Sequence, residues 1–409
     1  MKLSKGSFLL FLLGTGWYTQ LVAQPLLSPA AGVPAAQQAL RQNFENISFD
    51  TTGGRSTVYY EQRLYRNPFI GLIEMRQVTT GSTDAPGAPA SAGTPGAGTP
   101  AVIKNFVPLI QGIPVGKYSM EGERLEFSPL SRGERQTYYV QRPHRPWRQY
   151  KLDFWLQPQF AAYFGNRNQP IESNTYLLLM TQLYLSRGLV LNGGVLFPLT
   201  NDLDNRPNIV RPAPLFLNQF LALDGDHFVS ASAGFFHDDQ YGLNVQYRHM
   251  PLSGAWSFGA ETGLTGEFYF TRRGAIYGAL DNLLLLADVA YRLPRPDLTL
   301  KLSGGQYLAN DVGARLDIIR QFTNVEVGLY TTKSRNGATL GFNLAVPIPP
   351  GKLWQGDRAR LRTGEEFRWE YTYTRGYNIG ERYRTGYQLD QRLRQYHRNY
   401  LNRQYQMLK

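Results

Sequence analysis

The sequence predicts a mainly β fold: a single transmembrane antiparallel β-barrel of about 12–14 strands, preceded by a small α/β module. Three observations support this fold class. Residues 149–375 consist of short apolar runs of period two, separated by turn residues. Ionisable residues recur on the face opposite to the apolar one. Aromatic residues, 13% of the chain, gather near the ends of these runs, where a membrane barrel has its interfacial girdles.

Residues 1–23 have the layout of a secretory signal peptide. Lys2 and Lys5 supply positive charge, and residues 8–13 form an apolar core that is too short to cross a bilayer, which takes about 20 residues. A buried helix at the start of a soluble domain is the alternative, but the prolines that follow would break it. The chain has no cysteine, so we expect neither a disulfide scaffold nor a lipid anchor on an N-terminal cysteine.

Residues 37–130 predict the small α/β module. Val58 and Tyr60 alternate with polar neighbours as in a strand, and Asn67-Pro68 is typical of a helix N-cap followed by proline at the first helical position. Residues 81–100 are nearly all Gly, Ala, Pro, Ser and Thr. Because such a stretch cannot bury apolar surface, we expect a disordered insertion there. Strands over residues 102–110 and 113–120 should rejoin the module.

The barrel strands are expected over residues 149–375. Short turns such as residues 186–188 alternate with longer loops over residues 200–211 and 271–282, as in outer-membrane barrels. Residues 367–374 are expected to add one or two last strands. A soluble β-sandwich or propeller is the alternative, because its strands also alternate. Long strands with ionisable residues on one face favour the membrane barrel.

Strand parity predicts which side chains face the lumen. The candidates are polar or charged residues on the face opposite to the apolar one: Lys151, Asp153, Gln246, Arg248, Glu261, Lys301, Arg315, Asp317 and Glu370. Mixed charges paired across a lumen can plug it, whereas a continuous basic ladder would favour an acidic polymer. The sequence leaves both arrangements open.

Residues 376–409 form a basic tail rich in Tyr and Arg. From residue 351 onward the chain holds 13 Lys or Arg against 6 acidic residues, which is typical of a solvated tail or of a segment that binds an anionic polymer. Basic and aromatic residues together can also bind nucleic acid, but export disfavours that partner. The candidate polymer contacts are Arg382, Arg384, Arg392 and Arg394.

Four stretches carry a family resemblance: residues 58–68, 112–115, 216–236 and 298–328, the last with Ser303-Gly304-Gly305-Gln306-Tyr307-Leu308-Ala309-Asn310-Asp311. They resemble the YjbH family, outer-membrane β-barrel proteins associated with exopolysaccharide production. The first two stretches resemble the family's small periplasmic module, and the other two resemble its barrel. The resemblance implies an outer-membrane location with the module in the periplasm. It also implies a role in exopolysaccharide or capsule export or assembly, with membrane lipid, surface polysaccharide and other export proteins as partners.

Two other functions remain open at this stage: a structural or adhesion barrel that retains surface polymer, and a barrel lipid hydrolase. A hydrolase would need an activated nucleophile. His237-Asp238-Asp239 is the strongest candidate for a base or a metal ligand, but the sequence has no Gly-x-Ser-x-Gly motif. We therefore expect no enzyme activity, metal or cofactor. An even number of strands would place the module, the tail and the turn at residues 186–188 on one side of the membrane, and the two longer loops on the other.

Overall fold

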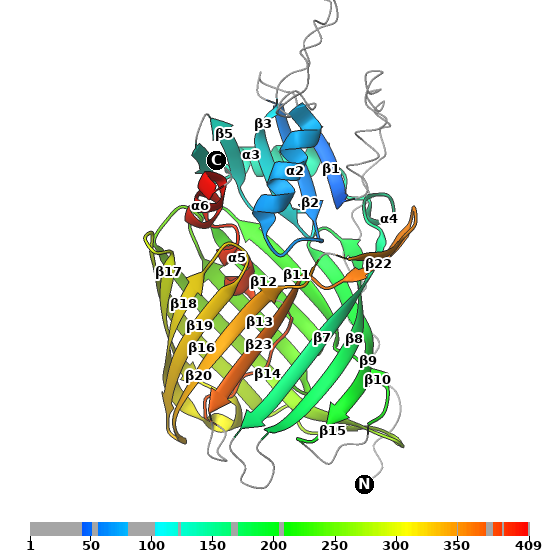
Figure 1. Ribbon diagram of the computed structural model, residues 1–409, viewed down its shortest axis with the longest axis vertical. Coiled ribbons are helices and arrows are strands. Elements are labelled where there is room, and N and C mark those ends of the chain that lie inside the picture. Colours follow the sequence, from blue (N-terminus) through cyan, green and yellow to red (C-terminus); the bar gives the residue numbers. More distant parts are fainter. Residues whose placement is uncertain are drawn as a thin grey trace, which may run out of the picture.

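The computed structural model describes residues 43–50, 56–80, 103–121, 124–164, 171–203, 208–349, 351–373, 379–386 and 388–407. The signal peptide at residues 1–23 and the insertion at residues 81–100 were predicted from the sequence and lie outside the described residues. The described chain has two parts, a strand-built wall and a smaller α/β module at one end of it (Figure 1).

The module is built on a five-strand path, β1-β2-β3-β5-β6, covered by helix α2. Asn67 caps α2 as predicted, since its Oδ1 accepts a hydrogen bond from the backbone N–H of Phe69 at 3.0 Å. Phe69, Leu72 and Met75 bury one face of the helix in the module core. The elements are β1 (Phe44–Asp50), β2 (Ser56–Gln62), α2 (Pro68–Thr80), β3 (Ile103–Ile110), β4 (Ile113–Pro114), β5 (Lys117–Glu121) and β6 (Arg124–Ser128).

The module extends beyond residue 130, where the sequence analysis ended it. Helix α3 (Arg132–Gln141) begins with a capping box between Ser131 and Glu134, and the short helix α4 (Pro146–Gln149) follows it. Tyr138 of α3 is buried and stacks on Tyr59 of β2 with ring centroids 4.7 Å apart. This packing makes α3 part of the module. The Ser-x-x-Glu pattern was the sequence signal that could have placed the helix.

The wall is a large antiparallel sheet in which each long strand pairs with the next along the chain. Its elements are β7 (Leu152–Phe164), β8 (Ile171–Ser186), β9 (Leu189–Asn201), β10 (Arg211–Pro212), β11 (Leu215–Leu223), β12 (His227–Phe235), β13 (Gln240–His249), β14 (Trp256–Thr271), β15 (Gly274–Tyr277), β16 (Asn282–Leu293), β17 (Leu298–Gln306), β18 (Val312–Gln321), β19 (Glu326–Ser334), β20 (Gly337–Pro347), β21 (Lys352–Gln355), β22 (Ala359–Thr363) and β23 (Glu366–Tyr373). The mainly β fold predicted from the sequence is confirmed.

The sheet curves round until its last strands reach its first (Figure 1). β23 pairs with β20, while the hairpin β21–β22 turns back and β22 pairs in parallel with β7. Gln157 of β7 donates a hydrogen bond from Nε2 to the carbonyl of Glu366 at 2.8 Å across the seam. The last strands are thus joined to β7 by a short parallel pairing and a side-chain hydrogen bond, and not by a long antiparallel ladder.

The two faces of the wall differ in polarity. On β13, Leu243 is 60% exposed on the outer face, whereas its neighbour Asn244 is 1% exposed on the inner face. The same alternation recurs on β17 and β18, where leucines point outward and Lys301 and Arg315 point inward. A soluble sheet protein shows the opposite arrangement, with its apolar face inside. Among the described residues, no helix is long and apolar enough to cross a membrane.

The C-terminal tail runs along the inner face of the wall, a path that was not predicted from the sequence. After β23 the described chain resumes at residue 379, and Tyr383 stacks on Phe236 and accepts a hydrogen bond from Asn244 of the inner face. Helix α5 (Leu389–Arg394) follows within the lumen. Helix α6 (Arg398–Met407) then reaches the module, where Tyr400 and Leu401 join its core (Figure 1). The chain end and the module therefore lie at the same end of the wall.

Candidate functional site

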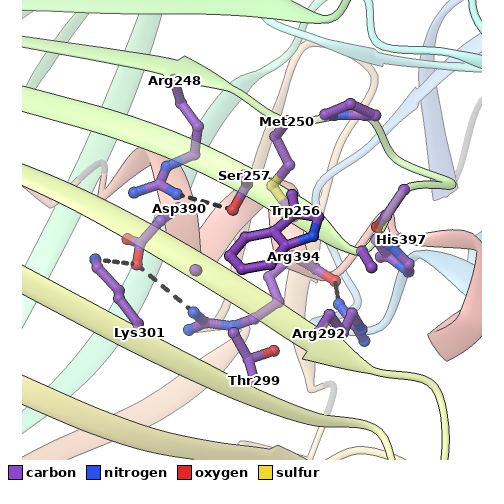
Figure 2. Close-up of a pocket in the computed structure, with 14 residues that line it drawn as sticks. Arg248, Met250, Trp256, Ser257, Arg292, Thr299, Lys301, Asp390, Arg394 and His397 are labelled. Carbon is purple, nitrogen blue, oxygen red and sulfur yellow. Dashed lines mark hydrogen bonds and ion pairs between the residues drawn. The ribbon is translucent and has the colours of Figure 1, made fainter.

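Buried ions fasten the tail to the inner face of the wall (Figure 2). Asp390 of α5 accepts a hydrogen bond from Lys301 Nζ at 2.8 Å and lies 3.6 Å from Arg394 Nη1. Lys301 also lies 3.8 Å from Asp288, which pairs with Arg248 at 2.6 Å. The space left among these side chains is about 20 Å³, room for about one water molecule. This network is therefore an attachment and not a ligand site.

A second line of ions joins the tail, the wall and the module. Glu326 of the wall pairs with Arg394 of the tail at 3.0 Å and with Arg368 of β23 at 3.1 Å. Glu366 then lies 3.0 Å from Arg368 and 2.6 Å from Arg66 of the module. Because each acid has two basic partners, the three parts of the molecule are linked by charge-assisted hydrogen bonds.

A third cluster joins the module to the first wall strand. Asp153 of β7 has a fully buried side chain and pairs with Arg360 at 2.5 Å, with Arg362 at 2.8 Å and with Arg63 of the module at 3.4 Å. Glu45 of the module contacts Arg63 in turn. We call these five residues the junction cluster.

A cavity of about 310 Å³ remains between the module, strands β7–β9 and the tail, within the usual size range of ligand pockets. Its polar lining combines amides with arginines and two acids: Gln62, Gln157, Gln159, Gln182, Asn192, Gln388, Gln391, Gln395, Arg63, Arg66, Arg362, Arg368, Arg384, Arg392, Glu365 and Glu366. Trp155, Leu178, Met180, Phe216 and Tyr396 add an apolar part. We call this space the lumen cavity.

The tail helix turns its amides toward the lumen cavity. Gln388, Gln391 and Gln395 are three or four residues apart and all line the cavity, whereas Leu389 and Leu393 pack on the wall side. Gln388 Nε2 and Arg66 Nη2 are buried donors without a hydrogen-bond partner among the described residues. These two donors lie behind the surface of the lumen cavity, so the cavity offers a ligand the other amides of its lining.

The structure places most of the predicted lumen residues on the inner face. Asp153, Gln246, Arg248, Lys301, Arg315 and Asp317 are buried there, and Glu261 and Glu370 make contacts on the same face. Arg315 pairs with Asp317 at 2.8 Å and with Glu370 at 2.9 Å. Lys151 instead precedes β7 at the rim of the barrel. These charges form pairs and not a continuous basic ladder, so the arrangement is the one that plugs a lumen.

The four arginines predicted as polymer contacts were expected on a solvated tail, but the structure places them on a tail that runs along the inner face of the wall. Arg394 is buried against Glu326, Arg382 donates to Gln388 at 3.2 Å, and Arg384 lies 3.5 Å from Asp238. These residues therefore belong to a tail that is attached to the wall. We call residues 379–394, which lie within the lumen, the plug. Arg384 and Arg392 also line the lumen cavity.

Sequence reasoning missed the residues that the module and the tail contribute. Gln62, Arg63 and Arg66 lie within residues 58–68, where the sequence indicated a strand, a helix cap and a family resemblance but no site residue. Glu326 gave no signal, since its partners lie 42 and 68 positions away in sequence. Arg360 and Arg362 alternate with Leu361, and this period-two pattern could have placed both on one face of a strand.

The structure does not bring His227, His237 and His249 together at one site. His237 lines the lumen cavity, whereas His227 and His249 lie on the outer face beside Tyr247, with a 2.8 Å contact between His227 Nδ1 and the Tyr247 hydroxyl. Within the part of the chain that the structure describes, no three His, Asp or Glu side chains are grouped as metal ligands.

A comparison with protein families finds one that matches the wall. The family described as exopolysaccharide biosynthesis protein YbjH matches residues 206–342, from just before β10 into β20. The predicted YjbH resemblance is confirmed over this segment. Searches of curated proteins and of solved structures found no significant match. The YjbH match covers Lys301, which pairs with Asp390, and Glu326, which pairs with Arg394, so it includes wall residues to which the tail is attached.

Proposed function

We propose that the protein is an outer-membrane β-barrel that takes part in exopolysaccharide or capsule export or assembly, with its module in the periplasm. The observation that carries this proposal is the lumen cavity, an amide-rich space inside a wall with an apolar exterior. The YjbH family name supports the association with exopolysaccharide.

The exterior of the wall supports membrane insertion. Its outer side chains are mainly large and apolar, and they follow strand after strand around the sheet. A contiguous apolar surface of this extent is unfavourable in water and favourable in lipid. Membrane fractionation should recover the protein with the outer membrane, and its migration on gels should change on heating. A soluble periplasmic pool of native protein would contradict the insertion.

The chemistry of the lumen cavity suits a sugar chain. Each amide offers a donor and an acceptor, which matches a hydroxyl group, and Trp155 and Tyr396 offer flat apolar faces for a sugar ring. Five arginines of the lining pair with an acid: Arg63 and Arg362 with Asp153, Arg66 with Glu366, Arg368 with Glu326, and Arg384 with Asp238. This balance favours neutral, hydroxyl-rich repeat units over a strongly acidic polymer.

The plugged lumen favours one alternative, a structural or adhesion barrel that holds polymer without passing it. Deleting the chromosomal copy in the native host and measuring secreted and cell-bound polysaccharide separately distinguishes the two. Export predicts a loss of both fractions, whereas retention predicts that polymer shifts from the cells to the medium. Unchanged polysaccharide in both fractions would rule out both roles.

We propose no enzymatic activity. A barrel lipid hydrolase remains the third candidate, with His237 as the histidine that lines the lumen cavity. Incubating the detergent-solubilised protein with phospholipid tests this candidate. Turnover that is lost in a His237→Gln variant would establish the hydrolase and overturn our proposal.

A further inference from the structure

The rim of the barrel carries a lateral projection made of α4 and the hairpin β21–β22 (Figure 1). The two pieces lie next to each other because both are joined to the start of β7. α4 directly precedes β7 in the chain, and the backbone N–H of Leu152 donates to the carbonyl of Arg358 at 2.9 Å. We call residues 145–149 and 352–359 the rim projection.

The rim projection exposes large apolar side chains. Trp147 is 85% exposed, Trp354 is 57% exposed, and Leu353 is also exposed beside Trp354. Exposing two tryptophans and a leucine to water is unfavourable, while tryptophan prefers the boundary between lipid and water. Leu152, the first outward residue of β7, is exposed as well and connects the projection to the apolar exterior of the wall.

Basic residues surround these apolar side chains. Arg145, Arg148, Lys352 and Arg358 are exposed, and Asp357 is the acidic residue of the rim projection. Apolar anchors flanked by basic side chains are typical of protein segments that lie on anionic lipid surfaces.

The projection is held in place instead of hanging loosely. Tyr150, which follows α4, stacks on Tyr184 with ring centroids 3.6 Å apart and donates to Glu61 at 2.6 Å. On the other side, Lys352 contacts Asn43 of the module through its ammonium group. The orientation of the exposed tryptophans is therefore built into the fold.

We propose that the rim projection is a membrane anchor that binds anionic phospholipid headgroups and inserts Trp147 and Trp354 at the lipid–water boundary. The anchor fixes the rotation and tilt of the barrel and holds the module close to the leaflet. This inference rests on the membrane insertion proposed above, and it is independent of the polymer that the barrel handles.

The absence of native cysteine makes site-directed spin labelling a direct test. The full chain is reconstituted in phosphatidylethanolamine–phosphatidylglycerol vesicles with one label at a time, at Trp147→Cys or Trp354→Cys. Val140→Cys on α3, where Val140 is 74% exposed, is the control for a surface in water. Leu302→Cys at an outward position of β17, where Leu302 is 52% exposed, is the control for lipid.

The anchor predicts that labels at positions 147 and 354 are more accessible to oxygen than to a water-soluble nickel chelate, as at position 302, and that position 140 shows the reverse. Replacing phosphatidylglycerol by phosphatidylcholine should raise nickel accessibility at positions 147 and 354 only. If position 302 reports lipid while 147 and 354 behave like 140, the anchor is overturned and the membrane barrel stands. If position 302 also reports water, the membrane insertion itself fails.

Discussion

The junction cluster and the attachment of the tail both use buried ions on the inner face of the wall, yet their surroundings differ. Asp153 has a fully buried side chain with three arginine partners, so water has no access to it. Asp390 keeps a small exposed fraction, and its helix borders the lumen cavity with the opposite face. The junction cluster therefore fixes the module to the wall as one body. The Asp390 network instead attaches the plug beside a cavity.

Changing Asp153 should have the largest effect. Asp153→Asn removes the charge that compensates Arg63, Arg360 and Arg362, so the free energy of unfolding should fall by about 3–5 kcal/mol. Urea titration in detergent micelles measures this change. Asp238→Asn is the matched control, because its pair with Arg384 is half-exposed and should contribute at most about 1 kcal/mol. Equal effects of the two changes would contradict the proposed difference in burial.

The tail should also stabilise the module itself. Leu401→Ala leaves a cavity in the core that α6 shares with the module and should cost about 2–5 kcal/mol. Limited proteolysis of the module measures the effect locally. Gln406→Ala, on the exposed side of the same helix, should leave the cleavage rate unchanged. A module that resists protease equally well in Leu401→Ala would show that it folds independently of the tail.

A smaller effect is expected at Asp390. In Asp390→Asn, Lys301 keeps Asp288 and Arg394 keeps Glu326 as partners, so the loss should be about 1.5–3 kcal/mol. Hydrogen exchange should become faster over residues 379–394 while the wall strands stay protected. Faster exchange in the wall as well would mean that the plug and the wall open together, which would contradict a plug that loosens independently of the wall.

The last effect is absent at neutral pH and develops only on acidification, on the module side of the junction. Burial, with the nearby charge of Arg187, lowers the pKa of His144 to about 4 from its ordinary 6.5. As the pH falls from about 6.5 to about 4, the unfolded chain therefore binds a proton that the folded chain does not, and stability decreases. His144→Gln should flatten this part of the curve of stability against pH. Superimposable curves for the two proteins would exclude His144 as a source of the acid sensitivity.

The sequence predicted the wall well because its signal is local. Apolar and polar residues alternate along β13 and β17 because the wall has one apolar and one polar face. Each strand shows this alternation in its own sequence, so it can be predicted without knowing its neighbours. The inward position of Arg248 and Lys301 followed from the same parity. The path of the tail could not be predicted in this way, because Tyr383 and Arg394 find their partners only after the wall has formed. A basic, tyrosine-rich composition suits a segment in solvent as well as one inside a polar lumen, so the composition does not distinguish the two.

The most direct test of the central claim is binding of sugar in the lumen cavity. Oligosaccharides prepared from the extracellular polysaccharide of the native host are titrated calorimetrically into the detergent-solubilised full chain. We predict saturable binding that falls on the order of tenfold or more when Gln391→Leu and Gln395→Leu are combined, because the hydrogen bonds of two cavity amides are lost. Gln406→Leu, the same change on the exposed side of α6, should bind like the wild type. No binding, or equal binding by all three proteins, would contradict the account.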